Sequence, residues 1–122
     1  MPRVTHFELP ADDTDRAAKF YGGVFGWEFQ KWEGPMPYFL VMTGPDKQAG
    51  INGGMAPRRQ PGEPPTIVID VPSVDDYVTK LQKHGAKIVV PKMAIPTVGW
   101  CAYFLDPEGN TLGIFQADES AA

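Results

Sequence analysis

The sequence predicts an α+β fold of two tandem βαβββ modules, with eight strands in one half-open mixed sheet and the two helices outside it. Three observations lead to this prediction. The order strand, helix, three strands occurs twice along the 122 residues, at an offset that aligns His6 with Thr66. A proline-rich linker at 57–65 separates the two copies. The chain is also long enough for only one domain with a single core.

The first module is predicted over about residues 1–56. The segment "VTHFELP" at 4–10 alternates, which indicates a strand with Phe7 and Leu9 on one face and His6 and Glu8 on the other. An amphipathic helix follows in "ADDTDRAAKFYGGVFG", with Asp12, Asp13 or Thr14 as its cap. Its apolar side is formed by Ala17, Phe20, Tyr21, Val24 and Phe25.

Three short strands should complete this module, at 27–32, 38–44 and 51–55. The intervening segments "EGPMP" and "PDKQAG" have turn composition. The last strand contains the glycine pair Gly53-Gly54. It matches no phosphate-binding loop and is interpreted as a bulge or a bend in the strand.

The second module is predicted over about residues 66–117. "TIVIDV" is a strand, and Ser73 caps the helix in "SVDDYVTKLQKHG". Strands are then expected in "AKIVV", "WCAYFL" and "TLGIFQ", with a tight turn at "DPEGN". We expect "PKMAIPTVGW" at 91–100 to be a loop, whose apolar side chains cover either a cavity or a dimer contact.

Each module leaves one sheet face that it cannot cover alone, so two modules with helices outside should share a concave inner face. The residues expected to face the helices are Phe7, Leu9, Ile67, Ile69 and Val71. The residues expected on the inner face are His6, Glu8, Thr66 and Val68.

Composition excludes some classes of partner. The net charge is -4 and the 11 Lys and Arg residues are scattered, which argues against nucleic acid and slightly favours a neutral or cationic small ligand. No long apolar run or leader sequence occurs, so we expect a cytoplasmic protein without a membrane partner. The single cysteine, Cys101, is interpreted as a small hydrophobic residue in a strand rather than a reactive thiol.

Two segments, "HFELPADDTDRAAKFYGGVFGWEF" at 6–29 and "YFLDPEGNTLGIFQ" at 103–116, resemble the vicinal oxygen chelate superfamily. This group contains glyoxalase I, bleomycin-resistance proteins and extradiol dioxygenases. The resemblance implies the two βαβββ modules, a cavity enclosed by the sheet and, commonly, a homodimer. It determines the fold far better than the reaction.

Metal-dependent members of that superfamily hold a divalent ion through residues on three strands. The matching positions here are His6, Thr66 and Gly113, and only His6 has a strong ligand. One imidazole cannot replace the hydration of an ion. We therefore expect no cofactor, and a divalent metal is disfavoured.

The resemblance places a set of residues in the cavity. His6 and Tyr103 are the candidate catalytic residues, His6 as a base and Tyr103 as a hydrogen-bond donor to a substrate oxygen. The candidate substrate-binding positions are Glu8, Thr66, Trp100, Cys101 and Gly113. For His6 and Tyr103 the sequence also allows a purely structural role in the wall of the sheet, and Glu8 is more simply explained as a carboxylate at a solvated sheet edge.

The functional hypothesis is a homodimer that encloses a small organic molecule and acts as a metal-independent isomerase, epimerase or lyase by acid-base chemistry. One alternative is a binding protein that sequesters a ligand without changing it, like the bleomycin-resistance proteins. A second alternative is a metal-dependent enzyme similar to lactoylglutathione lyase, with substituted ligands.

Overall fold

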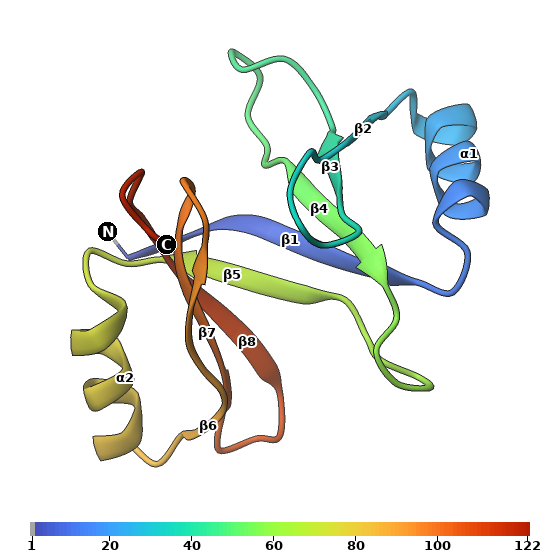
Figure 1. The fold of residues 1–122 in the computed structure, drawn as a ribbon. Coiled ribbons are helices and arrows are strands. Elements are labelled where there is room, and N and C mark those ends of the chain that lie inside the picture. The colour runs from blue at the N-terminus through green and yellow to red at the C-terminus, as the bar shows by residue number, and fades with distance from the viewer. Residues whose placement is uncertain (1) are drawn as a thin grey trace. The chain divides into compact units, whose positions relative to one another are not determined.

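The computed structural model describes residues 2–122, which form eight strands and two helices (Figure 1). In chain order these are β1 (Arg3–Ala11), α1 (Thr14–Phe25), β2 (Glu28–Lys31), β3 (Phe39–Met42), β4 (Gly53–Pro57), β5 (Thr66–Asp70), α2 (Val74–Lys83), β6 (Lys87–Ile95), β7 (Gly99–Leu105) and β8 (Thr111–Ala117). The order βαβββ thus occurs twice, and the predicted α+β fold class is confirmed. Within residues 2–122, neither helix has the length and apolar character to cross a membrane.

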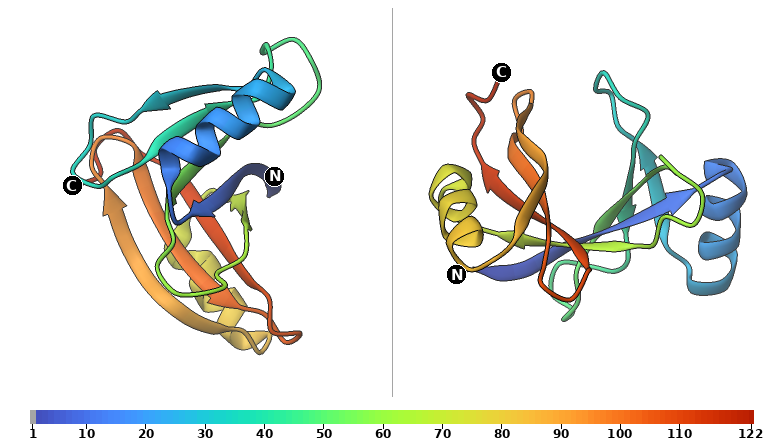
Figure 2. Two further views of the ribbon diagram at one scale, coloured as in Figure 1. Left: turned by 90° about the vertical axis from the view of Figure 1, so that its right-hand side faces the viewer. Right: turned by 90° about the horizontal axis from the view of Figure 1, so that it is seen from below.

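The contacts divide the chain into two compact units. The first unit is His6–Pro65; the second is Thr66–Ala122 together with the residues that precede His6. Each unit contributes four strands of the eight-stranded sheet and has one helix. Figure 2 gives two further views of these elements.

In the first unit the strand order is β2-β3-β4-β1. β1 runs parallel to β4, with Phe7 opposite Gly53 and Glu8 opposite Gly54, and the other neighbours are antiparallel. Successive residues of a strand point to opposite faces. Phe7 and Leu9 therefore pack in the core on one face, as predicted, while His6 and Glu8 belong to the other face.

The core of the first unit is small. Its fully buried members are Val41 and Met55, with Ala11 nearly so, and from α1 only two alanines pack against them. The apolar face predicted for the helix is largely exposed. Phe20, Val24 and Phe25 have 58%, 59% and 59% of their surface accessible. The helix contacts the sheet through the two alanines and through Tyr21, whose ring stacks on Trp27 at 5.3 Å.

In the second unit the strand order is β5-β8-β7-β6. β5 runs parallel to β8, and the other neighbouring strands are antiparallel. The loop predicted at 91–100 is wrong for most of its length. Residues up to Ile95 extend β6 and residues from Gly99 begin β7, so only Pro96–Val98 connect the strands. The backbone pairing between these two strands satisfies the N–H and C=O groups that a loop would leave to solvent.

The core of the second unit lies under α2. Ser73 caps the helix by accepting a hydrogen bond from the backbone N–H of Asp76, and Val74 in the first turn is fully buried. The other buried members of this cluster are Val71, Ala102, Phe104 and Ile114. Ile69 also packs against the cluster, whereas Ile67 is 43% exposed and does not.

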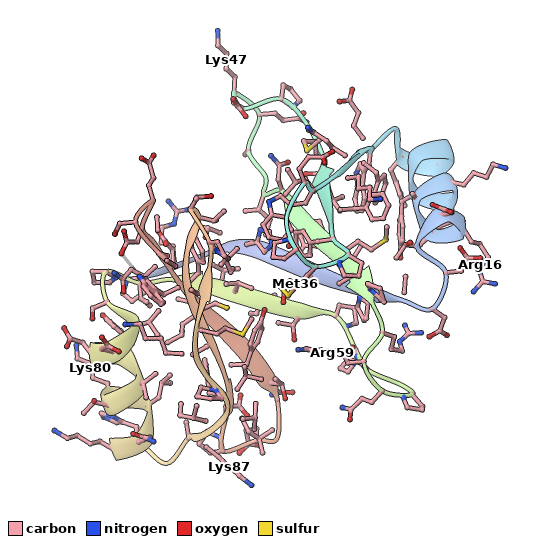
Figure 3. All side chains as sticks on the ribbon, viewed as in Figure 1. Arg16, Met36, Lys47, Arg59, Lys80 and Lys87 are labelled. Atoms are coloured by element: carbon pink, nitrogen blue, oxygen red, sulfur yellow. The ribbon has the colours of Figure 1, made fainter. Side chains whose placement is uncertain are left out.

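The linker is ordered by its two arginines. The guanidinium of Arg58 donates to the carbonyls of Pro10 and Glu63 and pairs with Asp12 at 3.1 Å. Arg59, labelled in Figure 3, holds the carboxylate of Glu63. These contacts fasten the linker to the end of β1, within the first unit.

Candidate functional site

A hydrogen bond between two side chains of the first unit joins His6 to Tyr38. His6 Nε2 lies 2.9 Å from Tyr38 Oη, and both side chains are half-buried. β1 places His6 on the face away from the core. Tyr38 directly precedes β3, and its phenol lies on the same face. The two groups are 32 positions apart in the sequence, so the sheet pairing brings them together.

The surroundings of His6 favour its neutral form. Burial lowers the pKa of the imidazole below its ordinary value of 6.5, and the carboxylate of Glu8 raises it by a smaller amount. Removal from water disfavours the charged imidazolium, whereas a nearby negative charge favours it. Because burial is the larger effect, His6 is mainly neutral at pH 7 and has a nitrogen lone pair that can accept a proton.

Tyr38 is the residue of this site that sequence reasoning did not single out. Its neighbours Phe39 and Val41 pack in that core, so alternation along "YFLVM" sends Tyr38 to the opposite face. That alternation was the available signal. The ring of Trp32 also meets Tyr38 edge-on, at 6.1 Å between centroids, which supports the phenol from one side.

Thr66, Gly113 and Tyr103 lie in the second unit. The Thr66 hydroxyl donates to the backbone carbonyl of Thr111 at 3.0 Å. Gly113 lies opposite Tyr103 across the strand pair, and an added Cβ there would come within 2.9 Å of the tyrosine ring. The ring therefore occupies the space that a side chain at 113 would need.

Trp100 and Cys101 are consecutive in β7 and so belong to opposite faces of the sheet. Trp100 packs with the cluster under α2, and its indole N–H donates to Asp118 at 2.9 Å. Lys92 lies over the indole ring and pairs with Asp75 of α2. The expectation that Trp100 lines the inner face is therefore wrong: it is on the helix side. Cys101 is buried in the strand, in agreement with its interpretation as a small hydrophobic residue.

Comparison with known proteins identifies the fold family. The model of the Glyoxalase/Bleomycin resistance protein/Dioxygenase superfamily matches residues 3–114, which is most of the chain. The chain belongs to this superfamily. The match includes the whole of the segment at 6–29 and the segment at 103–116 as far as residue 114, so it reaches the last strand of the second module.

Individual relatives agree with this assignment. A Mycobacterium bovis protein that bears the name glyoxylase CFP32 is 30% identical over 118 residues, which cover 91% of this chain and 44% of that protein. The chain therefore spans less than half of that relative's length. Among solved structures, protein BH1468 of Bacillus halodurans has a TM-score of 0.75 at 12% identity, covering 98% of this chain and 97% of its own.

A further solved structure is a methylmalonyl-CoA epimerase of Streptomyces coelicolor in complex with 2-nitronate-propionyl-CoA. It has a TM-score of 0.73 at 13% identity, covering 100% of this chain and 99% of its own. At such identities these likenesses establish the fold alone.

The residues at the superfamily's metal-binding positions do not fit a divalent ion. His6 supplies one imidazole, Thr66 supplies a hydroxyl that donates to a carbonyl, and Gly113 supplies no side chain. The space beside Gly113 is filled by Tyr103. Within residues 2–122, no three His, Cys, Asp or Glu side chains gather into a group that would hold an ion. A hard or borderline cation needs several strong donors at once.

Proposed function

We propose that this superfamily member binds a small organic molecule on the face of the first sheet opposite α1 and transfers a proton through His6 without a metal. The reaction class is isomerisation or epimerisation at a carbon next to a carbonyl group. The observation that carries the proposal is the 2.9 Å contact between His6 Nε2 and Tyr38 Oη. It fixes the orientation of an imidazole that is neutral at pH 7.

The phenol can donate or accept in this contact, and the proposed reaction uses the tautomer in which His6 donates. When Nε2–H donates to Tyr38 Oη, the lone pair is on Nδ1, and Nδ1 is the base. The hydrogen bond made by one ring nitrogen determines which nitrogen is available for chemistry. Tyr38 is thus a positioning residue, and His6 is the group that meets the substrate.

The chemical step begins with transfer of the proton from the substrate carbon to Nδ1. The electron pair of the broken C–H bond moves into the carbonyl group and gives an enolate, while His6 becomes an imidazolium. Glu8, which raises the pKa of His6, stabilises that charge. In an epimerisation the same carbon takes a proton from solvent on its opposite face, and the imidazolium releases its proton to solvent. In an isomerisation the substrate carbon also bears a hydroxyl group, whose proton moves to the enolate oxygen while the imidazolium returns its proton to the former carbonyl carbon.

Deuterium exchange tests this proposal. A panel of carbonyl compounds with an acidic neighbouring C–H, including methylmalonyl-CoA because of the similar fold of its epimerase, is first screened by thermal shift. Compounds that stabilise the protein are then incubated in D2O and followed by NMR. We expect wild-type protein to introduce deuterium into at least one ligand and His6→Gln to fail to do so. Ligands that bind without exchange would instead favour the sequestering alternative, and equal exchange by His6→Gln would exclude His6 as the base.

A further inference from the structure

The glycine pair of β4 has a role that neither a bulge nor a bend describes. β4 pairs regularly with β1 and with β3 through Gly53 and Gly54, so the strand is not interrupted there. The pair is required for close approach instead. A Cβ at Gly53 would lie 2.5 Å from the Phe7 carbonyl oxygen and 2.6 Å from its ring.

Gly54 allows a close approach on the opposite face of the sheet, where Tyr38 lies. A Cβ at Gly54 would overlap the Tyr38 ring and, most severely, its hydroxyl oxygen. Real Cβ atoms do not approach other atoms so closely. The Tyr38 phenol therefore lies directly on the bare backbone of Gly54, and this is the position from which its hydroxyl reaches His6 Nε2.

We infer that Gly54 is a positioning residue, whose missing side chain lets Tyr38 lie flat on β4 and hold the His6 ring by its Nε2 atom. This inference deepens the proposed function and rests on it for its catalytic meaning, but the geometry that it describes exists without any ligand. Gly54 touches neither the imidazole nor a substrate; it acts through Tyr38.

The substitution Gly54→Ala tests the inference. The atoms that the new methyl group displaces are the far end of one half-buried side chain. Tyr38 can swing away from the strand, at the cost of its contact with His6. Gly23→Ala is the matched control, because a Cβ at Gly23 of α1 meets no atom within contact distance.

The measurement is the 15N spectrum of the imidazoles in uniformly labelled protein at pH 8. The chain has two histidines, and His84 is an internal reference because its Nδ1 lies 2.9 Å from the Lys80 carbonyl, which can only accept a hydrogen bond. We expect wild-type His6 to be mainly the Nε2–H tautomer and His84 the Nδ1–H tautomer. Gly54→Ala should shift His6 toward a mixture of tautomers, by the same amount as Tyr38→Phe, and leave His84 unchanged. Gly23→Ala should change neither.

The double variant Gly54→Ala/Tyr38→Phe decides whether the glycine acts through the phenol. If it does, the double variant has the His6 spectrum of Tyr38→Phe alone. A wild-type His6 spectrum for Gly54→Ala, or a further shift in the double variant, would overturn the inference.

A stability cycle covers the case in which Gly54→Ala does not fold. Tyr38→Ala removes the overlapping ring, so Gly54→Ala should cost little in that background, and failure of the double alanine variant to fold would also overturn the inference. All these measurements are made without ligand. A protein that exchanges no substrate proton would contradict the proposed function and leave this result standing.

Discussion

The two βαβββ units differ in the length of their strands, in how much their helices bury and in what their tyrosines contact. In the second unit, β6, β7 and β8 have 9, 7 and 7 residues, and α2 buries Val74 completely. In the first unit, β2, β3 and β4 have only 4, 4 and 5 residues, and α1 buries no residue. Buried apolar area is the main source of folding free energy, so the second unit is the better stabilised of the two.

The units nevertheless repeat one arrangement. In each, a glycine of the last strand lies beside the first strand and under a tyrosine ring: Gly54 under Tyr38, and Gly113 under Tyr103. The matching residues of the two first strands differ in what they contact. His6 meets the Tyr38 hydroxyl, whereas Thr66, which matches His6 in the repeat, donates to the Thr111 carbonyl. The shared arrangement of glycine and tyrosine thus carries the His6–Tyr38 pair in the first unit.

The largest expected effect concerns the two matching positions of the first strands. His6→Gln should lower the exchange rate about 100-fold or more, since loss of a general base typically costs about 10²–10⁴ in rate. Thr66→Val should leave that rate within about threefold of wild type, because it removes one hydrogen bond at the edge of a strand. NMR-detected exchange on both variants makes the comparison, and a larger loss in Thr66→Val would reverse our ranking of the units.

Stability should separate the two helices next. Val74→Ala leaves a cavity in the core under α2 and should reduce the free energy of unfolding by about 2–3 kcal/mol. Val24→Ala in α1 should change it by less than about 0.5 kcal/mol, because the side chain is 59% exposed and alanine favours a helix. Urea unfolding of both variants measures the difference. Similar losses would mean that α1 is covered in solution.

The two tyrosines provide a smaller and more specific test. Tyr38→Phe should lower the exchange rate about tenfold, which corresponds to roughly 1.4 kcal/mol, because His6 loses the hydrogen bond that orients it. Tyr103→Phe keeps the ring that covers Gly113 and should change the rate by less than Tyr38→Phe does. Steady-state rates of the two variants at one substrate concentration are sufficient. The opposite order would restore Tyr103 to the role that the sequence suggested for it.

The smallest effect is a pH dependence of stability. The folded pKa of His6 lies below its ordinary value of 6.5, so just below pH 6.5 the unfolded chain binds more protons than the folded one. The free energy of unfolding should therefore rise as pH increases through the window that ends near 6.5, by less than about 1.4 kcal/mol for each unit by which the pKa is lowered.

Urea titrations between pH 5 and pH 8 measure this slope, and His6→Gln should flatten it. His84 lies in the second unit at the end of α2, so His84→Gln is the control from the other module. A slope that persists in His6→Gln would mean that another group is responsible.

Prediction from sequence succeeded where the signal was local. The caps are examples: Asp13 accepts from the backbone N–H of Arg16, and Ser73 does the same for Asp76. The turn at "DPEGN" is another. Asp106 accepts backbone hydrogen bonds from Glu108 and Asn110, and the bond from Asn110 is the main reason that the pKa of its carboxyl is lowered. Such contacts span a few residues, so residue type and spacing are enough to foresee them.

Prediction failed where a contact depends on strand register or on what covers a face. The apolar side of α1 has the predicted helical spacing, but most of its large side chains are exposed. Periodicity does not say whether anything packs on such a face. The extension of β6 toward Ile95 was missed because two prolines and a Gly resemble a loop, whereas antiparallel pairing with β7 supplies the missing backbone partners.

By itself, then, the sequence determined the order of the elements, the repeat of the βαβββ order and the helix caps, because each of these depends on residue type at a fixed spacing. Only the tertiary structure decided that Tyr38 forms a hydrogen bond with His6, that Trp100 lies on the helix side, and that the Tyr38 phenol lies on the backbone of Gly54. These contacts join residues far apart in the chain. Their geometry follows from strand register, which shifts every side chain to the other face when it changes by one residue.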